Sequence, residues 1–156
     1  MRGRIYTVTF SAVAVSAAQD LFELTPAANR PIEIVGIELG QTSDSGDAQD
    51  EQLQITIVRG HTTSGSGGST PTPAPLSPLD TAAGFSAEAN NTTIASSGTG
   101  VVLHAGVWNV RAGYTQWWPE EARPTASAAN TTLVLRQTAS ADGITMSGTL
   151  YVRELA

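Results

Sequence analysis

The feature that most constrains this chain is a period of two in its apolar residues, repeated in short segments along the sequence. In the segment 52–57, Leu53, Ile55 and Ile57 alternate with polar residues. A period of two puts successive side chains on opposite faces of a β-strand, whereas an amphipathic helix needs a period of about 3.6 residues. The pattern therefore predicts half-buried strands, each with one face toward a core.

Eight segments are predicted to be strands. They are 4–10, 19–24, 31–41, 52–57, 100–111, 114–118, 131–137 and 144–155. No segment longer than two turns keeps a helical period, and 82–90 is expected to hold one short helical turn at most. Gly36 and Gly106 interrupt two of the strands and predict bulges or kinks there.

Short strands separated by turn residues predict an all-β protein. The favoured fold is a single antiparallel β-sandwich domain over residues 1–156, with the topology of a jelly roll. A closed up-and-down barrel is the alternative, although such barrels usually have shorter and more regular hairpins. Residues 60–99 depart most from regular strand spacing and predict one long Gly/Ser/Pro-rich excursion.

Composition narrows the possible functions. The 156 residues include no cysteine, which excludes disulfides, thiolate zinc sites, iron–sulfur clusters and thiol nucleophiles. The formal net charge is −6 and only 14% of residues are charged. A nucleic-acid partner is not expected, because neutralising phosphates takes many basic side chains. A membrane partner is not expected either, because no apolar run approaches the roughly 20 residues that span a bilayer.

The first 18 residues share some features with a secretory signal. Arg2 and Arg4 precede an apolar stretch, and small residues follow at 14–17. The apolar region of a signal peptide is continuous, whereas residues 6–11 alternate between apolar and polar side chains. The alternation favours a strand that stays in the protein.

Few residues are suited to catalysis or metal binding. His61 and His104 have no partner at a metal-ligand spacing, and no serine lies in a Gly-x-Ser-x-Gly context. We therefore expect neither an enzyme nor a cofactor. The acidic segment 44–51 lacks the alternating carboxylates of a calcium loop, so a solvated connection is favoured over a calcium site.

Aromatic residues gather in one short segment of the chain. Trp108, Tyr114, Trp117 and Trp118 lie within eleven residues, and they include all three tryptophans. On a strand, adjacent Trp117 and Trp118 point to opposite faces, so one enters the core and the other reaches the surface. We predict partner contacts for this cluster, because exposed tryptophan often anchors a partner. Coverage by a loop of the same chain and binding of a sugar ring are the alternatives.

The segment 60–80 begins with a Gly/Ser run and continues with prolines. These prolines are Pro71, Pro73, Pro75 and Pro78. Their spacing favours an extended polyproline II conformation, which loses little entropy on docking. We predict an arm that leaves its own domain through a hinge at 65–69 and contacts a neighbouring subunit, with a floppy surface loop as the alternative.

Five segments together resemble a known class of protein. They are 4–10 (RIYTVTF), 40–44 (GQTSD), 59–68 (RGHTTSGSGG), 90–93 (NNTT) and 146–152 (MSGTLYV). The pattern resembles small virion proteins of tailed bacteriophages, and among these the capsid decoration, or cement, proteins.

The resemblance implies a structural protein that is made in the bacterial host cytoplasm and located on the capsid surface of the virion. It implies a homotrimer with a jelly-roll or related fold that binds the major capsid protein and stabilises the head shell. The alternative is a tail or spike module of the virion that recognises carbohydrate on the host surface.

Overall fold

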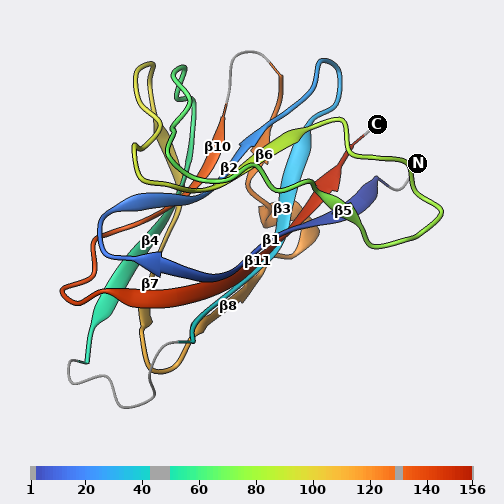
Figure 1. Cartoon of the computed structure of the whole chain (residues 1–156). Coiled ribbons are helices and arrows are strands. Elements are labelled where there is room, and N and C mark those ends of the chain that lie inside the picture. Colours follow the sequence, from blue (N-terminus) through green and yellow to red (C-terminus); the bar gives the residue numbers. More distant parts are fainter. Residues whose placement is uncertain (1–2, 43–49, 129–131, 156) are drawn as a thin grey trace.

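Residues 3–42, 50–128 and 132–155 are described by the computed structural model of the chain, in which antiparallel strands form two facing sheets (Figure 1). Sheet A has the strand order β5-β1-β11-β3-β8, with β9 also paired to β3. The bounds are β5 (Ala74–Pro75), β1 (Arg4–Val15), β11 (Ile144–Glu154), β3 (Ile32–Gln41), β8 (Tyr114–Trp117) and β9 (Thr125–Ala126).

Sheet B has the strand order β6-β2-β10-β4-β7. The bounds are β6 (Ser86–Asn91), β2 (Gln19–Thr25), β10 (Leu133–Gln137), β4 (Gln52–Arg59) and β7 (Val101–Asn109). In the part of the chain that the structure describes, the helical content is one 3-10 turn, η1 (Glu120–Ala122). The predicted all-β sandwich is confirmed, and the barrel alternative is wrong because the strands form two separate sheets.

Each strand predicted from the sequence is present, with shifted ends. In β11 the residues alternate between buried and half-exposed from Ile144 to Glu154, as the period of two requires. β1 continues beyond the predicted end to Val15, past an irregularity at which Ala12 has a φ of 53°. The bulges expected at Gly36 and Gly106 are displaced, because the pairing registers skip Val35 and Leu103 instead.

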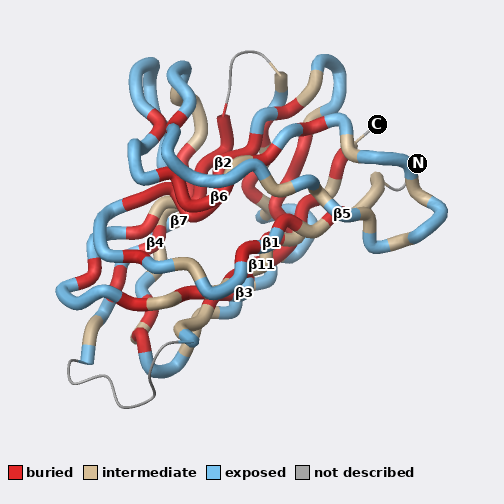
Figure 2. Tube along the Cα trace, in the orientation of Figure 1, coloured by how far each residue is buried: buried red, intermediate tan, exposed pale blue. Residues whose placement is uncertain are grey.

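The core lies between the two sheets, where the buried segments face each other (Figure 2). Tyr6 of β1 meets Phe85 edge-on, with ring centroids 5.6 Å apart. Phe10 of β1 packs against Phe22 of β2 at 5.2 Å. Each such side chain contributes about 1.5–3 kcal/mol through burial, so the inward rows of the long strands hold the sheets together.

The long excursion is present, but its segments are bonded to the sandwich. β6 pairs with β2, so the excursion contains a strand that the sequence did not predict, and segment 82–90 has no helical turn. β5 pairs with β1, and Leu76 N–H donates to the Ile5 carbonyl at 3.0 Å. The prediction that segment 60–80 leaves its own domain is therefore wrong, because its backbone pairs with strands of the same chain.

Candidate binding surface

The predicted aromatic cluster is divided between the core and the surface. Trp108 is 2% exposed, and its Nε1–H donates to Gln137 Oε1 at 3.2 Å. The Trp108 ring is therefore buried inside the sandwich and cannot contact another molecule. Trp117 and Trp118 point to opposite faces, as expected. Trp118 is partly buried against the core, whereas Trp117 is 48% exposed on the outer face of sheet A.

Tyr114 and Trp118 close one side of the sandwich against His104 of β7. The Tyr114 hydroxyl lies 2.8 Å from His104 Nε2, and the Trp118 ring meets the His104 ring edge-on at 5.2 Å. Burial lowers the pKa of His104 and raises the pKa of Tyr114. The neutral forms of both side chains are thus favoured in this corner, which joins β7 of sheet B to β8 of sheet A.

The exposed ring of Trp117 rests on a fixed support. Gly36 is the register partner of both Trp117 on β8 and Tyr151 on β11. A Cβ at Gly36 would lie 2.5 Å from the Trp117 ring, so only glycine leaves room for the ring to lie over the strand. The Trp117 and Tyr151 rings meet above it with centroids 4.7 Å apart and planes tilted by 40°.

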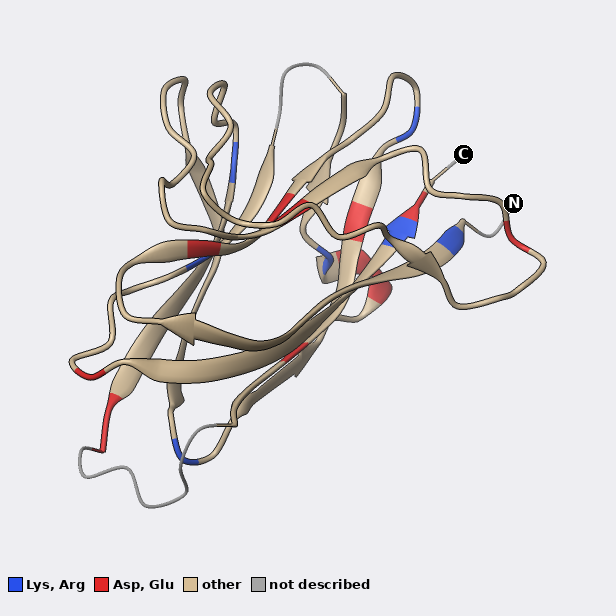
Figure 3. Cartoon of the chain, in the orientation of Figure 1, with Lys and Arg blue, Asp and Glu red and all other residues tan. Residues whose placement is uncertain are grey.

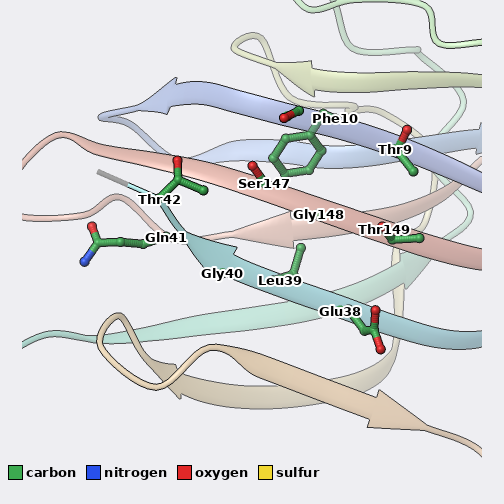
Figure 4. Close-up of a pocket in the computed structure, with 11 residues that line it drawn as sticks. Thr9, Phe10, Glu38, Leu39, Gly40, Gln41, Thr42, Ser147, Gly148 and Thr149 are labelled. Carbon is green, nitrogen blue, oxygen red and sulfur yellow. The ribbon is translucent and has the colours of Figure 1, made fainter. Parts of the chain in front are cut away.

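A shallow hollow of about 440 Å³ lies farther along the same face (Figure 4). It crosses β1, β11 and β3, where Thr9, Thr149 and Glu38 form one register row. The Tyr151 hydroxyl donates to Glu38 Oε2 at 3.4 Å, which links the aromatic pair to the hollow. Burial, together with the charge and hydrogen bond of Glu38, raises the pKa of Tyr151. We call the surface formed by Trp117, Tyr151 and the hollow the sheet A platform.

The four prolines of the excursion lie along the outside of the sandwich. Pro75 is part of β5 and is the register partner of Tyr6 on β1. Pro71 and Pro73 are half-buried before it, and Pro78 is exposed in the turn that follows. Pro75 on β5 and Trp117 on β8 lie at opposite edges of sheet A, so the prolines and the tryptophans do not form one site.

Two loops that stand side by side in Figure 1 lie over β2 on the outer face of sheet B. We call these segments, 60–69 and 91–100, the paired Thr loops. Thr63 bridges to Ser96, and Ser66 bridges to Thr93, through reciprocal backbone hydrogen bonds of 2.9–3.0 Å. The two loops therefore form a small ladder of their own above the sheet.

Buried carboxylates on β2 hold the paired Thr loops. Gly65 N–H donates to Glu23 Oε2 at 2.9 Å, and Ala95 N–H donates to Asp20 Oδ2 at 2.6 Å. Asp20 is fully buried and pairs with Arg136 of β10, whose Nε lies 2.6 Å from Asp20 Oδ1. These acidic side chains therefore act in stability, because they accept backbone N–H groups that would otherwise be buried without a partner.

β7 presents the most apolar free edge of the sandwich. It is the last strand of sheet B and pairs with β4 alone. Three of its valines are exposed, Val101 by 46%, Val102 by 58% and Val107 by 59%. No charged residue occurs in the strand. An uncharged edge of this kind is normally avoided in monomers, since it offers unpaired backbone groups to other chains.

Among the described residues, no three His, Asp or Glu side chains are grouped so that they could hold a metal ion. Residues 43–49 of the acidic segment lie outside the described residues, so the calcium alternative stays untested there. Glu51, which follows them, is engaged in structure: its carboxylate accepts N–H groups of Ala141 and Asp142 at 2.7 and 3.1 Å.

Charged side chains are sparse along the chain (Figure 3), and several of the described arginines lie in ion pairs. Arg153 lies 3.1 Å from both Glu33 and Glu120, and Arg123 lies 2.7 Å from Glu33. Further ion pairs among the described residues join Arg4 to Asp80, Arg30 to Glu154 and Arg136 to Asp20. Within the described ranges, no helix has the length and apolar character needed to cross a bilayer.

Comparisons with known protein families, with curated proteins and with solved structures each gave no match. The case for a function therefore depends on the surfaces described above. Sequence reasoning singled out Trp117 but missed Tyr151 and Glu38, which complete the sheet A platform. It also missed the exposed valines of β7, although the run Val101-Val102 without a neighbouring charge was a readable signal.

Proposed function

We propose that the chain is a structural protein of a tailed-phage virion, a capsid decoration (cement) protein that forms a homotrimer and binds the major capsid protein on the head surface. The observation that carries the proposal is the free apolar edge of β7. An edge without charge lacks the usual protection against pairing with another chain, so it suits a protein whose role is to attach to others.

The edge suits the addition of an extended segment from a neighbour. In that mode, backbone hydrogen bonds give affinity and the side chains on either face give specificity. Val102 and Val107 supply apolar surface beside the free backbone groups, and no ion pair of β7 has to be desolvated.

The order of the strands supports a jelly roll, the fold expected from the resemblance. β1, β11, β3 and β8 face β2, β10, β4 and β7, and successive long strands exchange sheets except between β4 and β7. This is the order of two interlocked Greek keys. β5 and β6 are then additions within the connection between β4 and β7, and β9 is an addition between β8 and β10.

The charge distribution fits attachment to protein rather than to nucleic acid. The net charge is −6. Several arginines are neutralised by carboxylates of the same chain, so they are not available to phosphate groups. A weakly charged surface rich in hydroxyl side chains forms hydrogen-bonded contacts without the cost of desolvating ions. The same acidic surface would avoid the phage genome during assembly.

Val107→Lys tests the proposal, because it places a charge on the free edge at an exposed position. We expect the wild-type chain to sediment as a trimer and to bind capsids that lack it, and the variant to lose both properties. Ser86→Lys is the matched control, since Ser86 is exposed on β6 at the opposite edge of sheet B. A wild-type chain that is monomeric and binds no capsid would overturn the proposal, as would equal binding by both variants.

A further inference from the structure

We propose that the sheet A platform binds a neutral oligosaccharide, with one sugar ring on Trp117 and a neighbouring unit in the hollow. This site goes beyond a role in attachment to the capsid, because it lies on the outer face of sheet A, whereas the free edge of β7 belongs to sheet B. A particle covered with the protein would display the platform to its surroundings.

Trp117 offers an aromatic face that is exposed and already held in place. Its ring is supported by Gly36 and by Tyr151, so binding would freeze little additional side-chain motion. One face of a pyranose ring carries mainly C–H groups, which pack favourably against the electron-rich face of an aromatic ring. A half-exposed tryptophan on an open sheet is suited to a flat ligand of this kind.

The hollow next to the aromatic pair offers the polar groups that sugar hydroxyls need. Thr9 and Thr149 contribute hydroxyl groups that both donate and accept, and Glu38 contributes a carboxylate that accepts. The Ser147 hydroxyl accepts the Ala12 N–H at 2.9 Å and can donate to a ligand. The volume of about 440 Å³ falls within the usual range of small-molecule sites. At Gly40 a Cβ would meet no atom within 4 Å, so the floor of the hollow is open to a ligand.

The charges around the platform select a neutral ligand. Glu38 is the charged side chain that lines the hollow, and no arginine lines it. Arg153 is the cation of the register row beyond Tyr151, and Glu33 and Glu120 neutralise it at 3.1 Å. A phosphate, sulfate or uronate group would therefore meet a like charge without a counter-ion.

Affinity electrophoresis of the full chain in native gels tests the proposal. The gels would contain dextran, galactomannan, a mixed-linkage β-glucan or, as the anionic polymer, alginate. We expect at least one neutral polymer to retard the wild-type chain and alginate not to retard it. A chain retarded by none of the neutral polymers, or retarded equally by alginate, overturns the proposal.

Variants then assign the binding to the platform. Trp117→Ala and Glu38→Gln are each expected to weaken binding about tenfold, equivalent to about 1.4 kcal/mol. Val107→Ala, which removes an exposed apolar side chain from sheet B, should bind as the wild type does. Melting curves check that every variant is folded. Equal loss in all three variants, or full binding by Trp117→Ala, would contradict the assignment.

The same variants separate this proposal from the capsid role. Trp117→Ala should still form trimers and bind capsids, and Val107→Lys should still bind the neutral polymer. If Trp117→Ala loses capsid binding while sugar binding is absent in the wild type, the platform is a protein interface and the saccharide proposal is wrong.

Discussion

The two outer faces of the sandwich are built from the same kind of strand but are used in opposite ways. On sheet B, the paired Thr loops lie over β2, where Asp20 and Glu23 accept their backbone N–H groups. On sheet A, the corresponding face is open, and its largest side chain, Trp117, remains half-exposed. One face therefore adds stability to the chain, and the other remains available to a ligand.

The covered face depends on small residues at equivalent places in the two loops. Gly65 and Ala95 are buried, and each donates its N–H to a carboxylate of β2. Both follow a Thr-Thr-x segment, at 62–64 and 92–94. Bulkier residues at these places would hold the loop backbone away from the sheet. The small residues therefore let the loops pack closely on β2 of the same chain.

Breaking the ion pair beneath the loops should have the largest effect. Arg136→Met leaves the fully buried Asp20 carboxylate without its cation, and we expect a loss of about 3–5 kcal/mol in the free energy of unfolding. The control is Arg153→Met on sheet A, where Glu33 keeps its contact with Arg123 at 2.7 Å. Its expected cost is about 1 kcal/mol or less. Urea unfolding measures both, and equal costs would contradict the comparison.

A methyl group added to each face should give the next largest difference. A Cβ at Gly65 would lie 2.6 Å from the Thr93 carbonyl oxygen, so Gly65→Ala should cost about 1–3 kcal/mol. A Cβ at Gly40 on sheet A meets nothing within 4 Å, so Gly40→Ala should be neutral or slightly stabilising. Thermal melting of the two variants tests this, and an equally destabilised Gly40→Ala would show that the sheet A face is packed after all.

Removing Trp117 should cost less stability than removing a core tryptophan, because about half of its surface is already exposed. Trp117→Ala loses the ring contact with Tyr151 and the burial of the other half of the side chain, a cost of about 2 kcal/mol. Trp108→Ala removes a core side chain and should cost about 3–5 kcal/mol. Chemical unfolding of both variants checks the contrast. Similar losses would mean that Trp117 is structural rather than available for binding.

The strands with a clear period of two were predictable, because burial on one face leaves a local pattern in the sequence. β6 was not, since its sequence Ser-Ala-Glu-Ala-Asn-Asn lacks the branched and aromatic residues that favour strands. It becomes a strand through pairing with β2 and through the contacts of Asn91 with Glu23 and Glu88. Such tertiary causes have no local signal.

The candidate site was predictable only in part, for the same reason. Adjacent residues on a strand point to opposite faces, so opposite orientations were expected for Trp117 and Trp118. The structure confirms this, because Trp117 is half-exposed and Trp118 packs against the core. The meeting of Trp117 with Tyr151 depends on the pairing of three strands distant in sequence, with Gly36 between them. The interruption at Gly36 was recognised, but its role is to make room for the rings, while the register shift falls at Val35.

The smallest expected effect concerns the corner where the two sheets meet, and it depends on pH. Burial lowers the pKa of His104 in the folded chain below its ordinary value near 6.5, so the unfolded chain binds a proton first as pH falls. The free energy of unfolding should therefore decrease as pH drops below about 6.5 and level off below the folded pKa. His104→Gln removes this contribution and leaves the other titrating groups in place, so the wild type should lose slightly more stability than the variant between pH 7.5 and 5.5. Urea unfolding at several pH values gives the difference, and parallel curves would show that the ring stays solvated between Tyr114 and Trp118.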